Sequence, residues 1–133
     1  MNKGNEMSVK VMVVDDMFNT RGIIKQLLSE SGYNVIGDFE DGVTALDFFK
    51  EEKPDLAILD YNLNCAKDGK CYTGVDLMKD MRKYRKDVKV IFISANAESS
   101  IIKKAILEGA SDFIGKPFNL AEVIERVNKI FKK

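Results

Sequence analysis

The sequence predicts an α/β domain in which five parallel strands form one sheet with helices on both faces. Short apolar runs alternate with segments of helical periodicity, which is the pattern of a parallel sheet covered on both sides. The chain has 133 residues, about the length of one domain. With 45% hydrophobic and 32% charged residues, it has enough apolar surface for a core and too little excess charge for disorder.

The five strands are recognised as short apolar runs that end at polar residues. They are expected at about residues 9–14, 34–39, 56–59, 88–93 and 112–114. The first is nearly all apolar, as a strand buried on both faces should be. The second is more polar, which is typical of a strand at the edge of a sheet.

Helices are expected between the strands and after the last one. Apolar residues at intervals of three and four place one face of each helix against the sheet. In the first helix these residues are Ile23, Ile24, Leu27 and Leu28, and in the last they are Leu120, Val123, Ile124, Val127, Ile130 and Phe131. Gly32 and Pro54 mark the ends of the first two helices, and Asn119 can cap the last.

Charge and composition exclude several functions. Lys plus Arg equals Asp plus Glu, at 21 each, so no net field favours binding to nucleic acid or to an anionic membrane. The chain has no histidine, which removes histidine acid–base chemistry, histidine metal ligands and a phosphohistidine on this chain. Without a signal segment or a spanning apolar run, the protein is expected to be cytoplasmic.

Polar residues follow four of the five strands at the point where each strand ends. They are Asp15 with Asp16, then Asp60, Ser94 and Lys116. Ligands of open parallel sheets bind at the carboxyl ends of the strands. These four ends become neighbours in the flavodoxin-like strand order 2-1-3-4-5, which leaves the second strand at the edge. We therefore expect that order and one polar site at this end of the sheet.

The residue types at these ends favour phosphoryl chemistry. Two carboxylates about 4 Å apart repel by about 4 kcal/mol at an effective dielectric of about 20, so three converging aspartates need a cation, and oxygen ligands suit Mg²⁺. An added ammonium and hydroxyl can stabilise the oxygens of a phosphoryl group in transfer, and one carboxylate can accept it as an acyl phosphate. Each residue alone is more often a cap or a solvated charge; their combination favours a site.

The order and spacing of these residues resemble the receiver domain of two-component response regulators, especially the single-domain chemotaxis-type members. The resemblance rests on Asp15-Asp16, Asp60, Ser94-Ala95 and Lys116-Pro117-Phe118. It covers nearly the whole chain. We expect a flexible N-terminal arm at residues 1–8 and a receiver domain at residues 9–133.

The resemblance implies an acceptor and a metal site. Asp60 would accept a phosphoryl group from the phosphohistidine of a sensor histidine kinase or a histidine phosphotransfer protein. Asp16, Asp60 and the backbone carbonyl of Asn62 would bind Mg²⁺, and Asp15 would hold metal-bound water. The chain would catalyse only its own phosphorylation and dephosphorylation, so it would not be an enzyme in the usual sense.

The resemblance also implies a switch. Lys116 would pair with the phosphoryl group and Ser94 would hydrogen-bond to it. Phe113 would turn inward as Ser94 moves, although a plain core phenylalanine fits that position too. The surface of the fourth helix, fifth strand and fifth helix would then change its affinity for a downstream effector protein.

Three other possibilities stay open or are disfavoured. The chain could be a receiver-like interaction module that works without phosphorylation, or the excised receiver of a longer DNA-binding regulator. A phosphatase with an aspartyl intermediate fits less well, because such enzymes usually carry a second aspartate where this chain has Asn62.

The segment at residues 61–73 is longer than usual in the family, and the next helix is expected to begin near Gly74. It could gate the site, contact a kinase or be a tolerated insertion, which we favour. It contains Cys65 and Cys71. A redox-sensitive loop is disfavoured because cytosolic thiols are usually reduced.

Overall fold

The computed structural model of the chain describes residues 8–63 and 72–131. The N-terminal arm expected at residues 1–8 lies, except for Ser8, outside the described residues. Both cysteines, Cys65 and Cys71, lie outside them as well. None of the helices in these two ranges combines the length and the apolar character that a membrane-spanning segment requires.

Five parallel strands form a single sheet in the order β2-β1-β3-β4-β5, which confirms the predicted order and the edge position of the second strand. The strands are β1 (Lys10–Val14), β2 (Asn34–Phe39), β3 (Leu56–Asp60), β4 (Lys89–Ser94) and β5 (Asp112–Gly115). Val14 lies opposite Leu59 in β3, and Ser94 lies opposite Gly115. The carboxyl ends of the four strands other than β2 are thus aligned.

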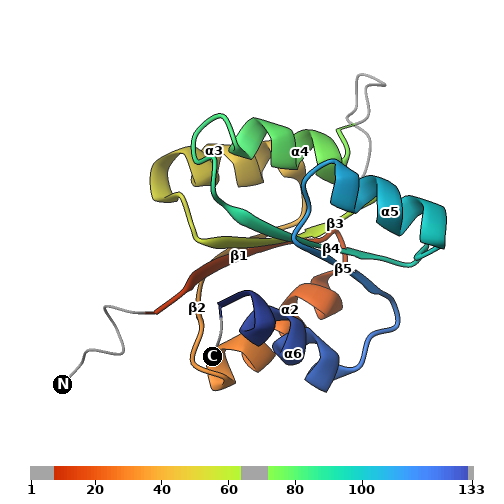
Figure 1. Cartoon of the computed structure of the whole chain (residues 1–133). Coiled ribbons are helices and arrows are strands. Elements are labelled where there is room, and N and C mark those ends of the chain that lie inside the picture. The colour runs from red at the N-terminus through yellow and green to blue at the C-terminus, as the bar shows by residue number, and fades with distance from the viewer. Residues whose placement is uncertain (1–7, 64–71, 132–133) are drawn as a thin grey trace.

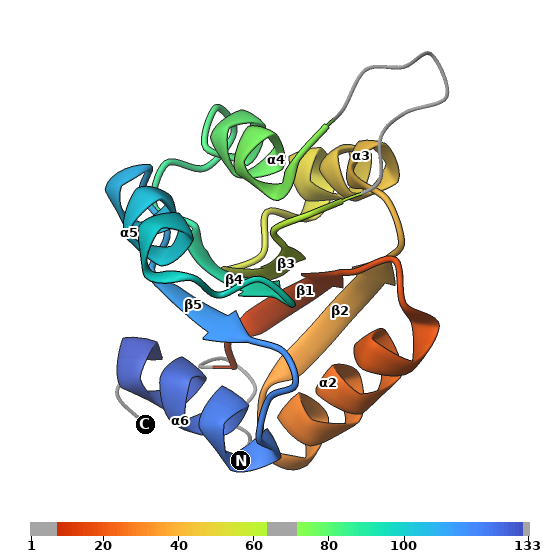
Figure 2. The ribbon, with the colours of Figure 1, turned by 90° about the vertical axis from the view of Figure 1, so that its right-hand side faces the viewer.

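Helices cover both faces of the sheet, as predicted (Figures 1 and 2). One face carries α2 (Phe18–Glu30) and α6 (Leu120–Phe131), and the other carries α3 (Gly42–Glu52), α4 (Gly74–Met81) and α5 (Ser99–Leu107). The core therefore has two layers. Along β1, Met12 and Val14 face the layer under α3, α4 and α5, while Val11 and Val13 face the layer under α2 and α6. A strand buried on both faces needs this unbroken apolar run.

The helix ends follow local sequence signals. Asn119 caps α6, since its side-chain oxygen accepts a hydrogen bond from the Ala121 N–H at 2.7 Å. Thr73 and Asp76 form a reciprocal capping box at the start of α4. Gly32, just after α2, has φ of +93°, a left-handed conformation in which glycine is favoured.

Two residues expected on packed helix faces are exposed instead. Ile23 in α2 is 47% exposed and Leu120 in α6 is 48% exposed, so their predicted burial is wrong. The two helices lie on the same face of the sheet, and Ile24, Leu28, Val123 and Val127 take the positions against it. Ile23 and Leu120 instead line a shallow hollow between the helices.

Candidate functional site

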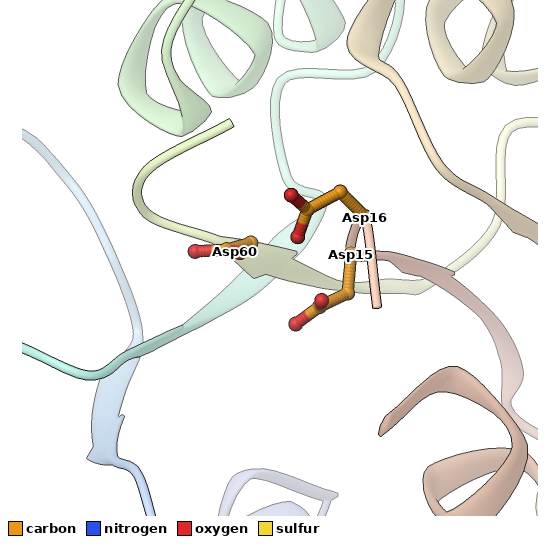
Figure 3. A group of neighbouring side chains, drawn as sticks. All are labelled: Asp15, Asp16 and Asp60. Carbon is orange, nitrogen blue, oxygen red and sulfur yellow. The ribbon is translucent and has the colours of Figure 1, made fainter. Parts of the chain in front are cut away.

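Three aspartates meet where β1 and β3 end side by side (Figure 3). Asp15, Asp16 and Asp60 each offer a carboxylate oxygen, and these oxygens all lie within 4.8 Å of one another. Asp15 is fully buried, Asp60 is 6% exposed, and Asp16 faces solvent. The predicted convergence of the acidic residues is therefore present in the structure.

Lys116 reaches this acidic group from the segment that follows β5. Its Nζ lies 2.9 Å from Asp15 Oδ2 and 3.8 Å from Asp60 Oδ2. The Lys116 backbone N–H donates to the Ser94 carbonyl at 2.7 Å, which ties the end of β5 to the end of β4. The peptide bond between Lys116 and Pro117 is cis. One ammonium group thus faces two of the three carboxylates.

The excess of negative charge in this group affects the pKa of Asp60. Burial raises the pKa of the Asp60 carboxyl above its usual value, and the charges of Asp15 and Asp16 raise it further. The backbone N–H of Asn62 and the Lys116 ammonium oppose this rise in pKa only in part. All the candidate donors are oxygen atoms with an excess of negative charge, so the group fits a hard divalent cation.

Asn62 connects Asp60 to Ser94. Its backbone N–H donates to Asp60 Oδ1 at 2.9 Å, and its side-chain Nδ2 donates to Ser94 Oγ at 3.1 Å. Ser94 is fully buried, and its hydroxyl oxygen also accepts a hydrogen bond from the Asn96 N–H at 3.0 Å. The serine hydroxyl is therefore held beside the acidic group by two donors.

Phe113 lies behind the site rather than in it. The side chain is 5% exposed, and its ring centroid lies 5.6 Å from that of Tyr61 and 6.4 Å from that of Phe92. This is the position of a core phenylalanine. Tyr61 directly follows the acceptor candidate Asp60, so Phe113 packs against the side chain of the residue next to the acceptor.

Gly74 allows α4 to begin directly against β3. A Cβ atom at this position would lie 2.5 Å from the Asp60 carbonyl oxygen and 2.9 Å from the Phe92 ring. Only glycine fits such a close approach without displacing backbone. The helix start expected near Gly74 is found there.

Sequence analysis did not single out Arg21, which touches the backbone of the acidic site. Its Nη1 donates to the Asp15 carbonyl at 2.7 Å, and its Nε donates to Asp38 Oδ2 at 2.9 Å. Asp38 lies on β2, 17 positions away in sequence, and no local pattern links the two residues. The packing of α2 against β2 brings them together.

A family model for the response regulator receiver domain matches residues 11–128 of the chain. This chain belongs to that family. The strand-end residues predicted a resemblance to this same receiver domain, and the family match confirms that prediction.

Curated relatives and solved structures agree with this assignment. The chemotaxis protein CheY of Thermotoga maritima is 33% identical over 126 residues, which span 95% of this chain and 100% of that protein. The CheY of Bacillus subtilis is 32% identical over 123 residues, which span 92% of this chain and 98% of that protein.

Among solved structures, the receiver domain of the putative response regulator NarL from Mycobacterium tuberculosis superposes with a TM-score of 0.81 at 32% identity. That match covers 94% of this chain and 97% of the other chain. A complex of CheX, CheY, BeF3 and Mg²⁺ from Borrelia burgdorferi gives a TM-score of 0.83 at 28% identity, over 94% of this chain and 90% of that chain.

Proposed function

We propose that Asp60 accepts a phosphoryl group from the phosphohistidine of a sensor histidine kinase or a histidine phosphotransfer protein. The observation that carries this proposal is the convergence of Asp15, Asp16 and Asp60 within 4.8 Å, with the Lys116 ammonium 3.8 Å from Asp60. Such a site places negative charge, a cation site and an ammonium around one nearly buried carboxylate. A cytoplasmic location follows from this function, because it must meet its phosphodonor there.

The transfer is a displacement at phosphorus. An oxygen of Asp60 forms a bond to phosphorus while the bond from phosphorus to the donor imidazole nitrogen breaks, and the imidazole leaves with the electron pair. Because Asp60 Oδ1 accepts the Asn62 N–H, Oδ2, on the side of Lys116, is the better placed nucleophile. The ammonium of Lys116 stabilises the charge that gathers on the phosphoryl oxygens.

Asp16, Asp60 and the carbonyl of Asn62 would hold Mg²⁺, with Asp15 acting through water. Mg²⁺ supplies positive charge that offsets carboxylate repulsion and stabilises the phosphoryl oxygens. Asp15 suits an outer position because it is buried and already bound to Lys116 Nζ at 2.9 Å. The CheY complex from Borrelia burgdorferi, which contains Mg²⁺ and BeF3, supports this choice of metal.

Phosphorylation would then shift the domain between two states. The new group adds about two negative charges and strong acceptor oxygens, which favour a hydrogen bond donated by the Ser94 hydroxyl. Ser94 Oγ now accepts from the Asn62 side chain and the Asn96 N–H, so its movement exchanges these contacts for the phosphoryl group. The buried ring of Phe113 couples that movement to the surface of α5, β5 and α6, where an effector protein would bind.

The proposal is tested by intact-mass measurement after incubation with phosphoramidate and Mg²⁺. We expect the addition of one phosphate that is base-labile and requires Mg²⁺. Asp60→Asn should lose the addition, whereas Asp47→Asn, which changes an exposed carboxylate on α3 outside the site, should retain it. If the wild-type chain binds Mg²⁺ but gains no phosphate, it is a receiver-like module that works without phosphorylation. The same assay should show no turnover of other phosphorylated substrates.

A further inference from the structure

Arg21 joins three segments around the acidic site. Its guanidinium Nη1 donates to the Asp15 carbonyl at 2.7 Å, and Nε donates to Asp38 Oδ2 at 2.9 Å. Its own backbone N–H donates to the Met17 carbonyl at 3.1 Å. The side chain is only 11% exposed. From its place in α2, one planar side chain therefore binds both the link after β1 and the edge strand β2.

The link that Arg21 holds carries two of the three acidic residues. Asp15 and Asp16 lie between Val14, the last residue of β1, and Phe18, the first residue of α2. Their carboxylates repel Asp60, so the backbone must be fixed for all three to converge. The position of the Asp15 carbonyl sets where both carboxylates of the link can point.

The usual devices that fix the start of a helix are missing from α2. Its N-cap residue, Met17, makes no side-chain capping hydrogen bond, and its first turn has no acidic residue. By contrast, the side chains of Asp41 and Thr73 cap α3 and α4. The Arg21 bridge, together with the Met17 N–H that donates to Asp15 Oδ1 at 2.8 Å, ties the start of this helix to the link that precedes it.

We infer that Arg21 is a positioning residue for the acidic site, held by Asp38 so that its guanidinium fixes the link between β1 and α2. It does not touch the reacting atoms. The inference rests on the proposed function to the extent that the acidic group binds Mg²⁺. Outer partners that orient metal ligands typically contribute about 10- to 100-fold to metal affinity.

Lys25 provides a matched control. It lies one turn further along α2, and its Nζ binds Asp38 Oδ1 at 3.0 Å. Within the described residues, the Lys25 side chain hydrogen-bonds to Asp38 and not to the link. Lys25→Met and Arg21→Met therefore remove the same charge from the same carboxylate, and only the second removes the contact with Asp15.

The test is the affinity of the full chain for Mg²⁺, measured by calorimetry on variants whose folding is verified by circular dichroism. Arg21→Met should weaken Mg²⁺ binding about tenfold, whereas Lys25→Met should change it by less than about twofold. Loss of a nearby cation would by itself strengthen Mg²⁺ binding, so a weaker affinity reports on geometry. Arg21→Lys should not restore the affinity, because one ammonium lacks the guanidinium fork that reaches both partners.

A second readout needs no metal. The Met17 N–H donates to Asp15 Oδ1 at 2.8 Å, so its hydrogen exchange reports on the order of the link. In metal-free protein, Arg21→Met should speed this exchange by about tenfold relative to Lys25→Met. Equal exchange in the two variants, or Mg²⁺ binding by Arg21→Met as tight as in the wild type, would overturn the inference. Failure of the wild type to gain phosphate would instead overturn the proposed function alone.

Discussion

Two aspartates on the strands that flank β1 are treated in opposite ways. Asp38 on β2 has two cations within hydrogen-bond distance, Arg21 at 2.9 Å and Lys25 at 3.0 Å. Asp60 on β3 has the Lys116 ammonium only at 3.8 Å and shares its site with two further carboxylates. Asp38 therefore has two cationic neighbours for one negative charge. Around Asp60, by contrast, the negative charges outnumber the positive ones.

The two pKa shifts express this difference. Partial burial would raise the pKa of Asp38, but the hydrogen bonds and charges of Lys25 and Arg21 outweigh burial and lower it. Burial and neighbouring carboxylates raise the pKa of Asp60. A paired carboxylate of the first kind stabilises the fold, while one of the second kind costs stability until a cation or a reaction partner arrives.

The largest expected effect comes from removing one lysine from the acidic site and one from the site of Asp38. Lys116→Met leaves the fully buried Asp15 without its cation and should lower the free energy of unfolding by about 3 kcal/mol in metal-free protein. Lys25→Met should cost less than about 1 kcal/mol, because Lys25 is 45% exposed and Arg21 remains on Asp38. Urea denaturation measures both values. Equal losses in the two variants would contradict the contrast.

A smaller effect is expected from adding a methyl group at a glycine next to Asp60 and at a glycine in α2, the helix that carries the cations of Asp38. Gly74→Ala would place Cβ 2.5 Å from the Asp60 carbonyl oxygen and should destabilise the domain by about 2 kcal/mol. Gly22→Ala meets no atom within 4 Å in α2 and should stabilise the domain by about 0.5 kcal/mol or more, because alanine favours the helix. Thermal denaturation of the pair gives the comparison, and a stable Gly74→Ala would show that α4 is free to shift away from the site.

The smallest effect concerns the carboxylates themselves. At pH 7 without metal, Asp60→Asn should stabilise the fold by about 0.5 to 2 kcal/mol, as removal of a strained functional group often does. Asp38→Asn should destabilise it by about 1 kcal/mol through the loss of its ion pairs. Mg²⁺ should reverse the order of wild type and Asp60→Asn. Destabilisation by Asp60→Asn in metal-free protein would refute the charge excess.

The pH dependence of stability in these two variants shows whether each ionised carboxylate stabilises or destabilises the fold. Because the folded-state pKa of Asp60 is raised, its cost is present at pH values above that pKa and disappears as the pH falls through it. Because the pKa of Asp38 is lowered, its stabilisation is present above the unfolded value near 3.8 and is lost as the pH falls through the lowered pKa. As the pH falls, the gain in stability of Asp60→Asn and the loss in stability of Asp38→Asn, each relative to wild type, should therefore both shrink.

Much of the fold and site could be predicted because both follow from short apolar runs and their ends. An apolar run such as Leu56 to Leu59 can only be a buried strand or a helix fragment, and the aspartate after it marks the strand end. Once the order 2-1-3-4-5 is assumed, Asp60 and Lys116 must lie at the same edge of the sheet. Their proximity follows from the strand order, so the sequence predicts it.

The parts that could not be predicted depend on contacts between elements. The exposure of Ile23 depends on where α6 lies beside α2, which helical periodicity does not encode. The Arg21 bridge to Asp38 depends on how α2 lies against the edge strand, and a single arginine in a helix carries no signal of its partner. The predicted roles of Ser94 and Phe113 in switching stay predictions, since they concern a second state.

The most direct test of the phosphoacceptor is chemical localisation of the phosphoryl group. Borohydride reduction of the protein treated with phosphoramidate and Mg²⁺ converts an aspartyl phosphate into homoserine, which peptide mass spectrometry can place. We expect homoserine at position 60, with Asp15, Asp16 and Asp38 unchanged. Homoserine at any of those three positions, with Asp60 intact, would contradict the assignment of Asp60 as the acceptor.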